Sequence, residues 1–241
     1  MKILSIGNSF SEDAHKWLHK LAECNGVQLE TANLLIGGCS LETHWNNVIE
    51  DNVSYALGLN GVFSNRKISI SQALELQKWD VVTVQQVSGL SGIYESYEPY
   101  LSNLVAVIRR AQPDAKLYFH QTWAYELDSK NPDFVRYDHN QAKMFECVKN
   151  TTQKIAKQIE AELIPTGKVI QSLRETVPEF DYKNGGISLC RDGSHLSLDY
   201  GRFAAAAVWF RTLCGKKIEV AEFENFSTEL LEKIIDVVNK I

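Results

Sequence analysis

Two short polar segments, far apart in the chain, carry residue types that cooperate in nucleophilic catalysis. Ser9 lies within the sequence GNSFS at positions 7–11, and Asp192 precedes His195 by three residues. A serine hydroxyl becomes a good nucleophile only when a neighbouring base takes its proton. An Asp three residues before a His can turn back to the imidazole within one loop and hold the tautomer that accepts such a proton. These spacings make Ser9, His195 and Asp192 candidates for nucleophile, base and orienting acid.

Each segment also allows a plainer interpretation. Residues 7–11 could form only a polar strand-to-helix turn with Ser11 as the helix cap, and Asp192 could cap a later helix. A helix N-terminus also suits a bound phosphate, as in flavodoxin-like folds. A flavodoxin-like phosphate- or nucleotide-binding protein is therefore an alternative function. It explains Ser9 but leaves Asp192 and His195 without a role.

The elements that must position these residues follow from the hydrophobic pattern. Short β-like runs alternate with longer helical patterns, which favours βαβ units and a parallel sheet. We expect an α/β fold of the doubly wound, flavodoxin-like type, with about five strands flanked by helices. The strands are predicted near residues 2–6, 28–36, 81–85, 116–121 and 162–165, whereas residues 41–76 indicate one helix and then irregular structure. Ser9 then falls at the carboxyl end of the first strand, where such folds place their working residues.

Helical periodicity predicts further elements between and after these strands. Helices are expected near residues 12–24, 97–111, 139–161, 199–214 and 227–241. Ser11 is the expected N-cap of the first helix and Asp138 that of the third. His15 and His19 lie one turn apart and could share a metal, but no helical Glu accompanies them. A solvent-exposed pair is therefore favoured, and no metal site is predicted.

Composition narrows the possible functions. The chain has 241 residues, 44% of them hydrophobic and 23% charged, which suits one domain over residues 1–241. The net charge of −5 gives no electrostatic basis for binding nucleic acid. Five cysteines without a CxxC pair indicate reduced, mostly buried thiols. With no visible signal peptide and no apolar run of about 20 residues, we expect a cytoplasmic protein that does not bind membranes. The oligomeric state is not predicted.

Taken together and in order, the motifs resemble the SGNH hydrolases, the GDSL-like lipase and acylhydrolase superfamily. Residues 7–11 are similar to the first block of that superfamily, with Asn8 where Asp is commonest. Gly38, in the sequence GGCS, is similar to the second block, and Asp192 and His195 match the last. The resemblance is nearest to a bacterial branch that begins with GNSFS and ends with DGxH.

The resemblance implies a serine esterase that needs no cofactor. His195 would take the proton of Ser9 and Asp192 would orient His195. The backbone N–H groups of Ser9 and Gly38 would bind the oxyanion of the tetrahedral intermediate. The expected partner is a small-molecule ester.

The third block departs from the common pattern. Most of the superfamily carries an Asn there whose side chain donates to the oxyanion, but residues 84–89 read VQQVSG. A Gln amide offers the same NH₂ donor on a longer arm, so we assign the role to Gln86 in preference to Gln85. A purely structural glutamine pair stays open. The missing Asn also leaves open a catalytically inactive SGNH fold that only binds a ligand.

The substrate is expected from the resemblance to carry a small acyl group, such as acetyl, on a carbohydrate or similar metabolite. Lipid and thioester substrates stay open. Polar and aromatic residues near the expected strand ends or after the second block could line the pocket, as suits a sugar ring: Trp45, Gln85, His120, Gln121 and Trp123. For the aromatic residues and His120, an ordinary place in the core is the alternative.

Overall fold

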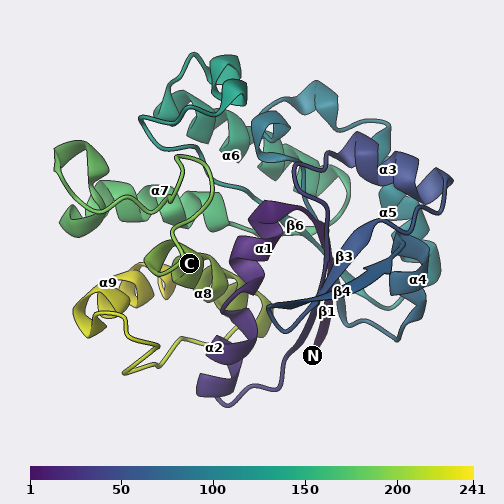
Figure 1. Ribbon diagram of the computed structural model, residues 1–241, viewed down its shortest axis with the longest axis horizontal. Helices are drawn as coiled ribbons and strands as arrows, with labels where there is room; N and C mark the ends of the chain where they lie inside the picture. Colours follow the sequence, from purple (N-terminus) through teal and green to yellow (C-terminus); the bar gives the residue numbers. More distant parts are fainter.

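A central sheet organises the molecule. The computed structural model describes residues 1–241 and contains seven strands in one mostly parallel sheet, with helices on both of its faces (Figure 1). The strands are β1 (Lys2–Gly7), β2 (Glu30–Leu35), β3 (Tyr55–Leu59), β4 (Val62–Ile68), β5 (Val81–Val84), β6 (Lys116–His120) and β7 (Glu162–Ile164). They lie in the order β4-β3-β2-β1-β5-β6-β7, and β3 alone runs in the opposite direction, antiparallel to β2 and β4.

Two hydrophobic cores lie on opposite faces of the sheet. The helices are α1 (Ser9–His15), α2 (Leu18–Cys24), α3 (Leu41–Ile49), α4 (Ile70–Glu75), α5 (Tyr100–Ala111), α6 (Gln141–Gln158), α7 (Thr166–Thr176), α8 (Tyr200–Cys214) and α9 (Thr228–Val238). Along β1, Ile3 enters the core covered by α1, α2, α7, α8 and α9, whereas Leu4 and Ile6 enter the core covered by α3, α4 and α5. Figure 1 shows these two groups of helices on either side of the sheet. Burial on both faces explains why the apolar residues of β1 do not alternate with exposed polar ones.

The predicted number of about five strands is wrong, because the sheet has seven. The five predicted strand regions correspond to the five parallel strands, and the two additional strands form a hairpin within residues 41–76. The hairpin turns at Asn60 and Gly61, both with positive φ, as an Asn-Gly turn requires. Most of β4 is polar and exposed, so it lacks the alternating apolar pattern that identifies a half-buried strand. The Asn-Gly pair was the signal available for finding it.

The start of the first helix also differs from the prediction. Asn8, not Ser11, is the N-cap, and the expected helix over residues 12–24 is divided into α1 and α2 near Trp17. Ser11 is buried, and its hydroxyl contacts the Asn8 carbonyl oxygen at 2.8 Å and Asn33 Oδ1 at 2.9 Å. The earlier start makes Ser9 the first residue of the helix, directly beyond the carboxyl end of β1.

Other expectations need similar correction. Asn140, not Asp138, caps α6, since Asp138 has a left-handed backbone conformation just before it. Helix α7 was not predicted from the sequence. All five cysteines are free, but only Cys39 and Cys190 are buried. No helix of the structure combines the length and the apolar character needed to cross a bilayer.

Candidate active site

The two motifs that lie far apart in the sequence meet at the carboxyl edge of the sheet. Ser9 Oγ lies 2.8 Å from His195 Nε2, and His195 Nδ1 lies 2.7 Å from Asp192 Oδ2. With its Nδ1–H donating to the carboxylate, the imidazole presents a lone pair at Nε2 to the serine hydroxyl. This is the relay of contacts through which a serine loses its proton to a base.

Local hydrogen bonds keep Asp192 ionised. Its Oδ1 accepts from the backbone N–H groups of Ser194, at 2.9 Å, and His195, at 2.7 Å. Burial alone would raise the pKa of the Asp192 carboxyl, but the bonds from His195 and from the Ser194 N–H outweigh it and hold that pKa well below its usual value. The carboxylate can therefore orient His195 and stabilise a positive charge on it throughout the neutral pH range.

The turn that carries Asp192 and His195 packs tightly against Ser129 and Trp123. Gly193 has a φ of 79°, and a side chain there would begin 2.8 Å from the Cα of Ser129. Trp123 Nε1 donates to the Ser194 carbonyl at 2.7 Å, and its ring stacks on Phe10 with centroids 4.2 Å apart. Trp123, a predicted pocket residue, is thus fully buried and supports the turn from within the core.

The two backbone N–H groups predicted as oxyanion donors, those of Ser9 and Gly38, are unpaired. Neither the N–H of Ser9 nor that of Gly38 donates to an acceptor within the protein. Gly38 is exposed and has a φ of 65°, a conformation that favours glycine. The Asn8 side chain joins the two loops by donating from Nδ2 to the Cys39 carbonyl at 3.0 Å. The arrangement can place two donors near a carbonyl oxygen bound at Ser9.

The structure does not leave the Gln86 amide available for this role. Its Nε2 donates to Ser96 O at 3.0 Å and to Ser96 Oγ at 3.2 Å, so the amide nitrogen is directed at Ser96. Its Oε1 accepts from the N–H groups of Leu41, at 3.0 Å, and Val87, at 2.8 Å, and this fixes the orientation of the amide. Gln86 therefore braces the loops after β5 and β2, and we do not retain it as an oxyanion donor.

Gln85, the second choice from the sequence, lies closer to Ser9. Its Nε2 donates to Asn8 Oδ1 at 2.8 Å, and its Oε1 accepts from His120 Nδ1 at 2.7 Å. His120 in turn contacts Thr166 Oγ1 at 3.0 Å through Nε2. Burial, with a smaller effect of His15, lowers the pKa of His120 to about 3, so the imidazole is neutral. This chain of neutral groups holds Asn8, next to the candidate nucleophile.

The remaining predicted pocket residues divide into buried and accessible positions. Gln121 is buried, and its amide donates to Thr152 Oγ1 at 2.9 Å and accepts from the Lys168 N–H. Gln85, His120 and Gln121 thus belong to the interior, because their polar groups are satisfied there. Trp45 is half-buried on α3 and is the one predicted aromatic that solvent reaches.

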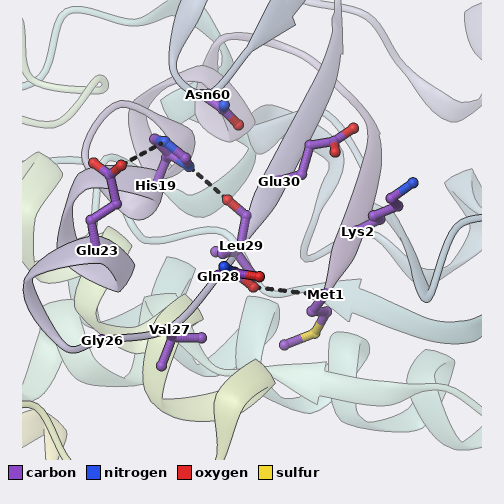
Figure 2. A pocket seen from close by; sticks show the side chains of 10 residues that line it. All are labelled: Met1, Lys2, His19, Glu23, Gly26, Val27, Gln28, Leu29, Glu30 and Asn60. Carbon is purple, nitrogen blue, oxygen red and sulfur yellow. Dashed lines mark hydrogen bonds and ion pairs between the residues drawn. The ribbon is translucent and has the colours of Figure 1, made fainter.

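A cavity lies at the opposite edge of the sheet. It has a volume of about 620 Å³ and includes Lys2 and Glu30, which begin β1 and β2 (Figure 2). His19 lines it and donates to the Leu29 carbonyl at 2.6 Å. His15 is instead buried, 2.7 Å from Ser5 Oγ, and burial lowers its pKa to about 3. The prediction of an exposed histidine pair is therefore wrong, because the helix breaks between the two residues.

The chain belongs to a recognised protein family. Residues 2–231 match the family described as a domain of unknown function, DUF4886, and the chain belongs to that family. A DUF4886 family protein from Bacteroides uniformis is 35% identical, with a TM-score of 0.92, over 100% of this chain and 93% of that one. No curated protein sequence matches the chain.

More distant structures share the fold. A protein from Slackia heliotrinireducens considered an SGNH hydrolase is 22% identical, with a TM-score of 0.59, over 88% of this chain and 98% of that one. Axe2, an acetylxylan esterase from Geobacillus stearothermophilus, is 14% identical, with a TM-score of 0.55, over 92% and 97%. The chain therefore has the SGNH fold.

Proposed function

We propose that this protein is a serine hydrolase that cleaves carboxylic esters, with Ser9 as its nucleophile. The observation that carries the proposal is the line of contacts from Ser9 Oγ to His195 Nε2, 2.8 Å, and from His195 Nδ1 to Asp192 Oδ2, 2.7 Å. If these residues served only the structure, a serine at a helix start would have no need to face the acceptor nitrogen of a histidine. Membership of the SGNH hydrolases is part of the same proposal.

The proposed mechanism has two steps. Ser9 Oγ attacks the ester carbonyl carbon while its proton passes to His195 Nε2, and the carbonyl π electrons move onto oxygen. The N–H groups of Ser9 and Gly38 stabilise that oxyanion, and Asp192 stabilises the imidazolium. His195 then protonates the leaving alcohol as the C–O bond breaks. Water, activated by the same imidazole, releases the acid from the acyl-enzyme and restores Ser9.

The proposed substrate is a small-acyl ester, such as an acetyl ester of a carbohydrate or similar metabolite. The shared fold with an acetylxylan esterase supports it, as does Trp45, the accessible aromatic four residues into α3. A half-buried indole can stack against the apolar face of a sugar ring. The proposed oxyanion donors are backbone N–H groups, and they do not select for the length of the acyl chain.

Hydrolysis of graded esters tests the proposal. Nitrophenyl acetate, butyrate and octanoate, followed by acetylated xylo-oligosaccharides, should be cleaved by the wild type with preference for acetyl. Ser9→Ala should reduce the rate to the uncatalysed level, whereas the exposed Ser102→Ala on α5 should retain full activity. If no ester is cleaved faster than by Ser9→Ala, the protein is an inactive member of the fold. A flavin or phosphate retained by the purified protein would favour the binding alternative.

A further inference from the structure

A second buried carboxylate lies one helical turn from the candidate nucleophile. Asp13 is on α1, four residues after Ser9, and its side chain is 0% exposed. Its Oδ1 accepts from Arg191 Nη1 at 2.9 Å and from Arg202 Nε at 2.7 Å. Its Oδ2 accepts from Arg191 Nη1 at 3.1 Å and from the Leu196 N–H at 2.9 Å. A buried charge is tolerated only when it is paired in this way.

Two of the three partners of Asp13, Arg191 and Leu196, lie at the two ends of the turn that carries Asp192 and His195. Arg191 immediately precedes Asp192, and Leu196 immediately follows His195. The turn is also closed on itself, because the Arg191 N–H donates to the His195 carbonyl at 2.9 Å. The Asp13 carboxylate, on the same helix as Ser9, thus bonds to both ends of the segment that carries His195 and Asp192.

We infer that Asp13 is a positioning residue that sets the separation of Ser9 Oγ and His195 Nε2. The inference rests on the proposed function, since it concerns the same triad. Misplacement of reacting groups by about 1 Å can cost on the order of 10²-fold in rate. The Asp13 carboxylate bonds to both ends of the turn at residues 191–196, and it should resist such displacement more than packing alone. Charge-assisted hydrogen bonds are roughly twice as strong as neutral ones.

The two arginines provide a matched comparison. Arg191 and Arg202 contact the same oxygen of Asp13, but only Arg191 belongs to the turn, whereas Arg202 lies on α8. Replacing either by Met removes one guanidinium from the same buried carboxylate. Both variants should lose stability, and only Arg191→Met should free the turn.

The decisive experiment is a comparison of kcat and KM per folded molecule. Asp13→Asn should lower kcat by about 10- to 100-fold with KM within about threefold, Arg191→Met should lower it about tenfold, and Arg202→Met less than threefold. In an Asp192→Asn background, Asp13→Asn should cost less than about threefold, because the turn no longer presents a working base. Three results would each overturn the inference. The first is a wild-type kcat in Asp13→Asn and Arg191→Met, and the second is an equal loss of kcat in Arg191→Met and Arg202→Met. The third is a double variant, Asp13→Asn with Asp192→Asn, whose loss is the product of the two single losses.

Amide hydrogen exchange keeps the test independent of catalysis. The N–H groups of Ser194 and His195 are bonded to Asp192, not to Asp13. Asp13→Asn should speed their exchange more than about tenfold while the amides of α9 stay unchanged. Unchanged exchange in the turn would overturn the inference even if the esterase is real. Faster exchange in a protein without esterase activity would instead refute only the proposed function.

Discussion

The two halves of the site are built from different chemistry. The half that carries the base is charged, with Asp192 beside His195 and Asp13 clamping the turn. The half beside Asn8 is neutral and consists of one bond from Gln85 to Asn8 and one from an uncharged His120 to Gln85. In the proposed mechanism, the carboxylates lie beside the histidine that gains positive charge, and the neutral groups lie beside the serine at which the oxyanion forms. The contrast shows how one loop cluster can stabilise both charges without opposing either.

Removal of the charge from the base half should have the largest effect. Asp192→Asn should lower kcat by roughly 10²–10⁴, because the amide can hold the wrong imidazole tautomer. Ser194→Ala is the control, since the Ser194 hydroxyl also contacts Asp192 Oδ1, at 3.0 Å, but leaves the carboxylate in place. It should cost less than about tenfold. Steady-state kinetics on one activated ester would contradict the contrast if Asp192→Asn kept a kcat near that of the wild type.

Acid should have the next largest effect, through three buried histidines: His120 of the neutral half, His15 against Ser5, and His44 against Tyr55. Burial lowers the pKa values of His15, His44 and His120 to about 3, below the usual value of about 6.5. Between about pH 3 and pH 6.5 these histidines are protonated in the unfolded chain but not in the folded one. The free energy of unfolding is therefore highest above about pH 6.5 and falls as the pH falls below it. Below about pH 6.5 each histidine should cost about 1.4 kcal/mol per pH unit. Only the unit between pH 6.5 and 5.5 counts, so the three histidines together should lower the free energy of unfolding by about 4 kcal/mol from pH 7.5 to 5.5.

Urea unfolding at the two pH values measures this drop. The exposed His139→Gln should leave it unchanged, whereas any of the three buried histidines, once replaced by a neutral residue that still folds, should reduce it by about one third. Equal free energies of unfolding at both pH values would show that the folded protein accepts charge at all three histidines.

The two glutamines should give the smallest and most discriminating effect. Gln85→Ala releases Asn8 and should lower kcat by about 10- to 100-fold with little change in KM. Gln86→Ala should lower the free energy of unfolding by about 1–3 kcal/mol, because it leaves buried N–H groups without an acceptor, and kcat per folded molecule should change less than about threefold. The reverse pattern would restore Gln86 as the oxyanion donor.

The sequence predicted the parallel strands and the candidate triad because both depend on local patterns. Apolar runs identify buried strands, and a GNSFS turn or an Asp three residues before a His is complete within one loop. The choice between Gln85 and Gln86 could not be made in this way. Adjacent residues at a strand end point in opposite directions, and the direction depends on the register of the sheet.

Asp13 was missed for a different reason. An acidic residue near a helix start usually interacts with the helix dipole at the surface, and its partner Arg191 lies 178 residues away. The available signal was its phase, since Phe10, Asp13 and Ala14 fall at i, i+3 and i+4 and therefore share the buried face of α1. A carboxylate on an apolar face requires a distant cation, which no local pattern can identify.

Covalent labelling of the serine tests the central claim most directly. The wild type, treated with a fluorophosphonate and digested with trypsin, should carry one adduct per molecule on Ser9 within the peptide of residues 3–16, and fragment masses separate Ser9 from Ser5 and Ser11. His195→Gln should slow the labelling by several orders of magnitude, because the hydroxyl loses its base. An adduct on any other serine, or a folded wild type that is not labelled, would contradict the account.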